Sequence, residues 1–349
     1  MRLEPRAHVP LWLSLTAPVA AIALAFACCA LLIVWSGAPV ITAYEALLRG
    51  AFGSVFALTE TLTRAAPMIF TGLAAAVAFR AKLWNIGGEG QLYAGALAAT
   101  WVGSGLVTLP PILMVPLLFL AGAVAGGLLL LVPVILKLKL KVDEVVTTLL
   151  LNFIVLLFVS YLLFGPWKDP LAMGWPQAAP IIDEGLLAPL VPRMRLHQGF
   201  LWAIAFAAFA WAFIRFTRWG FQIRAVGHNV EAAAFAGMPI GATVLRTALL
   251  SGGLAGMAGV CELAGVRGYL TLDLSPGFGY TGIAVAMLAG LHPLGVIAAA
   301  IFVAAIYNGA DAMSRAMSIS NYLADVLTAT ALLLVLASVL FVRFRPRLR

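Results

Sequence analysis

Ten apolar runs follow one another along this chain of 349 residues, and most are long enough to cross a lipid bilayer. About 20 apolar residues in a helix span the hydrocarbon layer. Inside that layer every backbone N–H and C=O needs a partner within the protein, so only helices and closed barrels cross it. The runs are continuous and do not alternate apolar with polar residues, as barrel strands do. The sequence therefore predicts an all-α polytopic membrane protein.

The number and placement of charged residues agree with this class. Only 10% of the residues are charged, against roughly 25% in soluble domains. The net charge of +8 does not indicate a nucleic-acid partner, because the basic residues lie singly or in short sets beside the ends of apolar runs. Lys and Arg gather in this way in the cytoplasmic loops of membrane proteins. We therefore expect membrane lipid around the chain and no nucleic acid.

Two connections between the predicted spans are longer than the others. Residues 165–199 form a polar connection that we place outside the cytoplasm, and residues 219–241 form a basic connection that we place inside it. Residues 1–349 are predicted to form a single transmembrane domain. The ten spans are expected at Leu11–Trp35, Ala65–Phe79, Leu92–Leu109, Ile112–Leu136, Val145–Phe164, Phe200–Phe216, Ala242–Ala264, Gly277–Leu291, Leu294–Asn308 and Tyr322–Phe344.

The orientation of the spans follows from the basic residues at their ends. With the N-terminus in the cytoplasm, 15 of the 22 basic residues fall on the cytoplasmic side, and the opposite orientation would place the same 15 outside, against the positive-inside rule. We therefore expect about ten transmembrane helices with both termini in the cytoplasm. The 15 residues are Arg2, Arg6, Arg80, Lys82, Lys137, Lys139, Lys141, Arg215, Arg218, Arg224, Arg246, Arg343, Arg345, Arg347 and Arg349.

The stretch Asn85-Ile-Gly-Gly-Glu-Gly-Gln91 interrupts two apolar runs with polar residues and three glycines. Glycine lets the backbone bend and lets a second backbone or a ligand approach closely. Irregular backbone at membrane depth survives only inside protein or beside a water-filled cavity, and Glu89 is costly in lipid unless it faces a pathway, a partner or the membrane rim. The stretch is either a tight turn between two spans or a broken helix that lines a translocation path.

A second glycine-rich start lies five spans later, at Ser275-Pro-Gly-Phe-Gly-Tyr-Thr-Gly-Ile283. An odd number of spans reverses the orientation, so the two starts would belong to inverted repeats. Broken helices at corresponding positions of such repeats mark the binding site of many transporters. Glycine is common in membrane helices, so a chance similarity is the alternative.

The basic connection contains a short predicted helix. Asn229 is a good N-cap, and Glu231 lies in the first turn, where the helix dipole favours a carboxylate. Alanines follow with one apolar side chain, Phe235, and Gly237 and Pro239 end the helix. A capped helix with a projecting aromatic side chain could dock into the groove of a partner; the alternative is a surface helix that only orders the loop.

The first glycine-rich stretch and the alanine-rich stretch each resemble a known family. Residues 80–91 resemble the Phe-Asn-Ile-Gly-x-Glu-Gly-Gln motif of ABC-importer permeases of the simple-sugar and nucleoside branch, within the ribose and branched-chain amino-acid permease superfamily. Residues 50–54, 61–68 and 71–73 are similar to the same family's lead-in, and the likeness runs from about Tyr44 to the C-terminus. Residues 142–152 and 251–259 also resemble the family, and the latter is a small-residue ladder typical of close helix packing.

The resemblance implies a function and its partners. The chain would be the nucleoside or sugar permease subunit of an ATP-driven importer in the bacterial plasma (inner) membrane. It would pair with a second, homologous permease as a heterodimer, with ABC ATP-binding subunits and with an extracytoplasmic substrate-binding protein. The family's coupling-helix pattern places ATPase coupling at Arg224, Gly227, Asn229, Glu231, Ala232, Ala233, Phe235 and Gly237.

Candidate residues of the substrate path follow from their polarity or aromaticity near the glycine-rich starts or within spans. Polar side chains would offer hydrogen bonds to a ribose or a base, and aromatic rings would stack on it, although helix–helix packing explains most of them equally well. Asn152, inside an apolar span, is the clearest case of a residue that could equally join helices. The candidates are Asn85, Glu89, Gln91, Asn152, Phe278, Tyr280 and Asn308.

Catalytic chemistry has no candidate residues in this sequence. The four histidines show no metal-ligand spacing, so we expect no metal, and no paired nucleophile and base supports an intramembrane enzyme. The phosphate-binding loop Gly-x-x-x-x-Gly-Lys-Ser/Thr is missing, so any ATP and magnesium would be bound by a partner subunit, and we expect no cofactor on this chain. The alternative function is an ion-gradient-driven secondary transporter that works without an ATPase.

Overall fold

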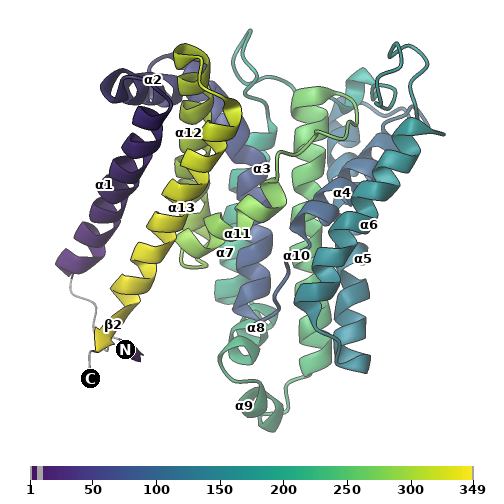
Figure 1. The fold of residues 1–349 in the computed structure, drawn as a ribbon. Helices are drawn as coiled ribbons and strands as arrows, with labels where there is room; N and C mark the ends of the chain where they lie inside the picture. Colours follow the sequence, from purple (N-terminus) through teal and green to yellow (C-terminus); the bar gives the residue numbers. More distant parts are fainter. Residues whose placement is uncertain (1, 6–10, 348–349) are drawn as a thin grey trace. The chain divides into compact units, whose positions relative to one another are not determined.

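The computed structural model describes residues 2–5 and 11–347 of the protein (Figure 1). Arg6 and Arg349, two of the 15 basic residues counted in predicting the orientation, lie outside the described residues. Apart from two short strands, the regular structure is helical. The elements are β1 (Arg2–Pro5), α1 (Leu11–Trp35), α2 (Val40–Phe52), α3 (Val55–Arg80), α4 (Gly88–Val102), α5 (Pro111–Leu140), α6 (Glu144–Phe164), the 3-10 turn η1 (Asp183–Gly185), α7 (Gly199–Phe216), α8 (Arg218–His228), α9 (Val230–Phe235), α10 (Ile240–Glu262), the π-turn η2 (Leu263–Arg267), α11 (Phe278–Leu288), α12 (Pro293–Met317), α13 (Asn321–Arg343) and β2 (Phe344–Arg347).

Each of the ten predicted spans overlaps one of these helices; α1 has the predicted bounds, and at least one end of each of the others is shifted. α3 begins ten residues before the predicted start at Ala65, because Pro67 is accommodated within a continuous helix. Six described helices are long and apolar enough to cross a membrane, and α1 with α2 forms a seventh candidate that is bent by 118°. The chain is therefore a multi-pass membrane protein whose candidate spans are all helical, as predicted.

The contacts divide the chain into two units, residues 1–61 with 301–349 and residues 62–300. In the first unit, β1 pairs with β2 in antiparallel register, with Arg2 opposite Arg347. α1 packs against α13. A small core forms around Ile33, Ala43 and Met313. That residues 1–349 form a single transmembrane domain stays a prediction.

The second unit is built on close contact between α4, α5 and α10. A Cβ atom added to Gly256 would lie 2.0 Å from the carbonyl oxygen of Gly122, and one added to Gly259 would lie 2.0 Å from that of Leu92. Neither backbone atom can rotate away, so only glycine permits this approach. The predicted small-residue packing face within residues 251–259 is confirmed.

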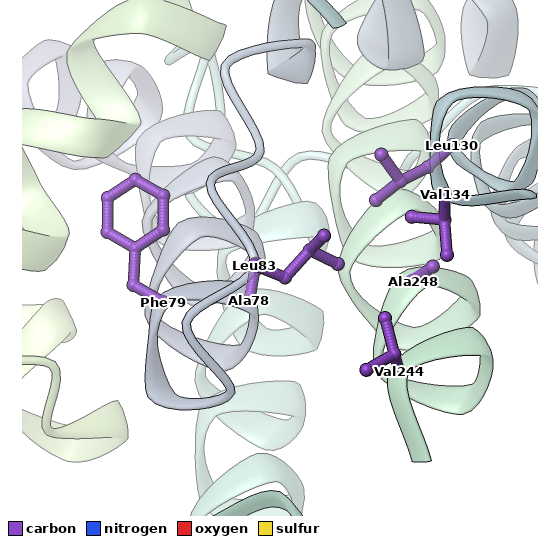
Figure 2. Close-up of a cluster of buried hydrophobic side chains, with 7 residues drawn as sticks. All are labelled: Ala78, Phe79, Leu83, Leu130, Val134, Val244 and Ala248. Carbon is purple, nitrogen blue, oxygen red and sulfur yellow. The ribbon is translucent and has the colours of Figure 1, made fainter. Parts of the chain in front are cut away.

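The end of α3 is fixed in this unit by apolar packing. Figure 2 shows Leu83 pointing toward Leu130 and Val134 of α5 and Val244 of α10, while Phe79 of the same cluster lies farther from them, on the other side of Leu83. Burial of such side chains contributes roughly 1.5–3 kcal/mol each in water-soluble proteins, but in a membrane the gain comes chiefly from close packing. This cluster holds the chain at the point where α3 ends and the segment toward α4 begins.

Candidate functional site

Two helices of the second unit begin inside the bundle, and their first turns meet. Figure 1 shows α4 and α11 starting part-way along the neighbouring helices. A Cβ atom added to Gly279 would lie 2.1 Å from the backbone nitrogen of Glu89, and one added to Gly88 would lie 3.1 Å from the carbonyl oxygen of Gly279. The two glycine-rich stretches singled out in the sequence are therefore in direct contact.

Glu89 joins the two helix starts. Its Oε2 accepts a hydrogen bond of 2.7 Å from the backbone N–H of Gly279, in the first turn of α11, while Glu89 itself lies in the first turn of α4. Free N–H groups at a helix start need acceptors, and a carboxylate is favoured there by the helix dipole. Glu89 is buried, with 3% of its surface exposed. A carboxylate at membrane depth needs a partner, and for Glu89 this partner is the start of α11.

Asn85 and Gln91 close the loop before α4 by bonding to each other. Asn85 Nδ2 donates to Gln91 Oε1 at 2.9 Å, and Gln91 Nε2 donates to Asn85 Oδ1 at 2.8 Å. Asn85 Nδ2 also donates to Ser251 Oγ, whose hydroxyl donates to the carbonyl of Ala74 on α3. This network links the loop to α10 and α3, so both amides have partners inside the protein.

Asn152 connects α6 to both helix starts. Its Oδ1 accepts from the backbone N–H of Gly90 at 2.8 Å, and its Nδ2 donates to the carbonyl of Ile86 and to the hydroxyl of Tyr280, each at 3.0 Å. The side chain is fully buried. These contacts are those of an amide that holds helices together. A hydrogen-bonded amide costs less free energy in the membrane than an unpaired one.

The remaining three path candidates lie in different settings. Phe278 is buried, whereas Tyr280 leaves 39% of its surface exposed and is the accessible aromatic side chain of the junction. Asn308 belongs to the first unit, where its Nδ2 lies within hydrogen-bond distance of the carbonyls of Gly50 and Ala57 and of Thr61 Oγ1. The structure thus brings six of the seven candidates together around one junction.

The coupling candidates lie on two consecutive helices, α8 and α9, and in the turns that flank α9. α9 begins after Asn229, whose side chain accepts from the backbone N–H of Ala232 at 3.0 Å, and the chain leaves it through Gly237 at φ +75°. The predicted N-cap and helix end are confirmed. Phe235 is 98% exposed, while Ala233 is buried. Arg224 and Gly227 belong to the preceding helix, α8.

Gly227 has a packing role that the sequence pattern did not reveal. A Cβ atom added there would lie 1.7 Å from the carbonyl oxygen of Arg80, at the end of α3. Nearby, Lys82 Nζ approaches the carbonyl of His228 at 3.5 Å. α8 is therefore pressed against the end of α3, and α9 projects from this contact (Figure 1).

Several residues of the junction were missed in the sequence. Tyr93 bonds through its hydroxyl to the carbonyl of Leu272 and accepts from the backbone N–H of Ser275, which ties α4 to the segment before α11. Thr148 Oγ1 accepts from the N–H of Ile86. Single Tyr, Thr and Ser residues in apolar runs are too common to signal such contacts, although Ser251 lies in a stretch whose family resemblance was recognised.

Paired helices that break at glycines and begin inside a bundle are typical of transporters, and the fold and junction define a membrane transport protein. Residues 57–336 match the family described as the permease component of the branched-chain amino acid transport system, and the chain belongs to this family. It is a transport component and not an enzyme.

Known relatives cover nearly the whole chain. A glucose ABC transporter permease of Haloferax volcanii is 36% identical, over 99% of this chain and 93% of its own. A guanosine ABC transporter permease of Bacillus subtilis is 36% identical over 93% of both chains. A nucleoside ABC transporter permease of Lactococcus lactis subsp. cremoris is 32% identical, over 85% of this chain and 84% of its own. No solved structure matches the chain.

Proposed function

We propose that this permease imports nucleosides or simple sugars as part of an ATP-driven ABC importer in the bacterial plasma membrane. The proposal is supported by the names of relatives that act on glucose, guanosine and nucleosides and by the motif around Asn85. Its partners would be ATP-binding subunits that hold ATP and magnesium, a second homologous permease and an extracytoplasmic substrate-binding protein.

The proposed orientation has ten spans and both termini in the cytoplasm. Contacts of the second unit support it, because basic residues from separate predicted cytoplasmic connections gather at one end. Arg80, Arg215 and Arg224 line a single pocket. Lys137 pairs with Glu144, whose Oε1 also accepts from the backbone N–H of Trp84. Such clustering at one end of the spans is what the positive-inside rule expects.

The observation that carries the coupling proposal is the exposure of Phe235 on α9. A large apolar ring that is 98% exposed on a short, capped helix has the form of an anchor for a partner's groove. α8 links this helix to the end of α3 through the contact between Gly227 and Arg80. We infer that movement of the ATPase is transmitted through α9 and α8 to α3 and then to the junction of α4 and α11.

The proposed substrate path runs beside this junction. Asn85, Gln91 and Asn152 would act mainly by fixing the helix starts, since their amides are already bonded. Tyr280 presents an exposed ring next to Asn152, and stacking on that ring would suit a nucleobase or the apolar face of a sugar. Alternating access would open the path as the α4–α11 junction changes its position between the two sides.

The coupling proposal is tested with Phe235→Asp in cells that contain the whole importer, by measuring uptake of labelled guanosine and glucose. We expect uptake to be lost and the ATP-binding subunit no longer to co-purify, while the permease remains in the membrane. Met173→Asp is the matched control, because Met173 is equally exposed but lies in the 165–199 loop, on the opposite side in the proposed orientation. It should leave co-purification of the ATPase unchanged.

Two results would refute the coupling proposal. One is normal ATPase co-purification with Phe235→Asp. The other is uptake by this chain alone in vesicles without ATP, which would establish the gradient-driven carrier instead. Ala233 is unsuitable for this test, because its side chain is buried and a charge there would disturb α9 itself.

A further inference from the structure

A basic pocket lies where four elements of the second unit meet. Its volume is about 310 Å³, and Arg80 at the end of α3, Arg215 near the end of α7, Arg224 of α8 and His292 before α12 supply its polar lining. Trp211, Ile214 and Pro293 complete the wall. No Asp or Glu is among these lining residues, so three guanidinium groups share one cavity without a carboxylate in its wall.

Two arginines of this pocket differ in their hydrogen bonds: Arg80 is held by one, and Arg224 has a buried nitrogen without a partner. Arg80 Nε donates to the carbonyl of Leu291 at 2.8 Å, which fixes the guanidinium plane and leaves its two terminal nitrogens free to point elsewhere. Arg224 Nη1 is buried and has no hydrogen-bond partner among the described residues. A buried, charged donor without an acceptor costs free energy. The pocket therefore lacks an anionic acceptor.

His292 adds a further side-chain donor to the same wall. Its Nδ1 accepts from the backbone N–H of Gly295 at 3.3 Å, so a neutral ring carries its proton on Nε2 and can donate from there. Several donors that converge on one cavity suit a tetrahedral group with several oxygens, and guanidinium forks match phosphate in charge and geometry.

We propose that this pocket binds a phosphate group, and that an anionic phospholipid of the surrounding membrane supplies it. The pocket lies at the ends of two helices of membrane-spanning length, α3 and α7. Its wall combines the arginines with an indole and two apolar side chains, which suits a headgroup whose glycerol and acyl chains continue along the protein. Basic pockets between spanning helices bind such headgroups elsewhere. The inference does not depend on the transported substrate or on Phe235.

The experiment uses the full-length permease in the complex in which it purifies, in detergent. Short-chain phosphatidylglycerol is titrated and its binding is followed by native mass spectrometry, with phosphatidylcholine of the same chain length and inorganic phosphate in parallel. Arg215→Gln and Arg224→Gln are compared with the wild type. Arg218→Gln is the matched control, because Arg218 starts α8 close to these residues in the sequence but does not line the pocket.

We expect each pocket variant to bind phosphatidylglycerol about tenfold more weakly, as for the loss of one charge-assisted hydrogen bond, and Arg218→Gln to bind it as the wild type does. Competition by inorganic phosphate with the same sensitivity to the variants would support the phosphate site but assign it to a soluble source. Equal binding of phosphatidylglycerol by all four proteins, or equal preference for phosphatidylcholine, would overturn the proposal. Arg215 is exposed, so its substitution tests the site even if Arg224→Gln fails to fold.

Discussion

The backbone N–H of Gly279 donates to Oε2 of Glu89 at 2.7 Å, across a sequence separation of 190 residues. One carboxylate thus satisfies a free N–H at the start of α11 while it lies in the first turn of α4. The two helix starts approach so closely that no side chain fits at position 279. This contact explains why glycine and glutamate are both needed in stretches that the sequence presents as separate motifs.

Gly279→Ala is expected to destabilise the permease. The new Cβ would lie 2.1 Å from the backbone nitrogen of Glu89, and backbone cannot move aside as a flexible side chain can. Overpacking of this kind typically costs about 1–3 kcal/mol. The measurement is the thermal unfolding midpoint of the purified permease, together with its yield in the membrane.

Gly241→Ala and Gly88→Ala are the controls for this prediction. Gly241 lies in α10 with nothing within 4 Å of an added Cβ, so alanine there should be neutral or stabilising by up to about 1 kcal/mol. Gly88 should give an intermediate loss, because the nearest atom is 3.1 Å away. Equal midpoints for Gly279→Ala and Gly241→Ala would show that the helix starts are less close than described.

Substitutions of Glu89 should separate its hydrogen bond from its charge. Glu89→Gln keeps an oxygen that can accept from Gly279, and it loses only the interaction of a carboxylate with two helix starts, about 0.3–1 kcal/mol for each. Glu89→Ala leaves a buried N–H without an acceptor, which costs about 1–3 kcal/mol more. We expect unfolding midpoints in the order wild type, Gln, Ala. If Gln were no more stable than Ala, the bond to Gly279 would not be what Glu89 contributes.

The helices could be predicted from the sequence because each depends on a local pattern. Apolar runs predicted the bounds of α1 and α6 to within a residue, and α6 begins after Asp143, whose side chain accepts from the backbone N–H of Val145. The start of α3 was placed too late, at Ala65, because the ten residues before it are mixed in polarity and Pro67 lies within the helix.

The contacts between helices could not be predicted in the same way. The sequence marked Gly88 and Gly279 as unusual, but their approach depends on how α4 and α11 cross, which no local pattern encodes. Ser251 and Tyr93 were also beyond reach, since their partners lie far along the chain. Arg80 and Arg215 were read only as charges at the ends of spans and Arg224 also as a coupling residue, although the three share one cavity.

Gly227→Ala should separate packing from coupling on the α8–α9 segment. The added Cβ would lie 1.7 Å from the carbonyl oxygen of Arg80, so we expect a lower unfolding midpoint for the permease even in the absence of the ATP-binding subunit. Phe235→Ala removes an exposed ring and should leave that midpoint unchanged. A wild-type midpoint for Gly227→Ala, with loss only of ATPase binding, would instead place Gly227 in the docking surface.

His197 is expected to make the permease less stable in acid. It lies in the 165–199 loop, just before α7, with 2% of its surface exposed. Its Nδ1 accepts from the backbone N–H of Gly199 at 3.1 Å, and its Nε2 is buried without a hydrogen-bond partner among the described residues. Burial, with a smaller effect of the Arg195 charge, lowers the pKa of His197 from 6.5 to about 4. The folded protein thus holds this ring neutral.

The sign of the effect follows from the two pKa values. Between pH 6.5 and about 4 the unfolded chain binds a proton at His197 that the folded chain does not, so the contribution to stability is lost as the pH falls through this window and changes no further below it. The full loss is about 3 kcal/mol.

In His197→Asn, an oxygen can replace Nδ1 as acceptor and nothing titrates, so its unfolding midpoint should fall less between pH 7 and pH 4 than that of the wild type. His228→Asn, at an exposed position of α8, should follow the wild type. The same fall in all three proteins would mean that His197 is charged or solvated in the folded permease.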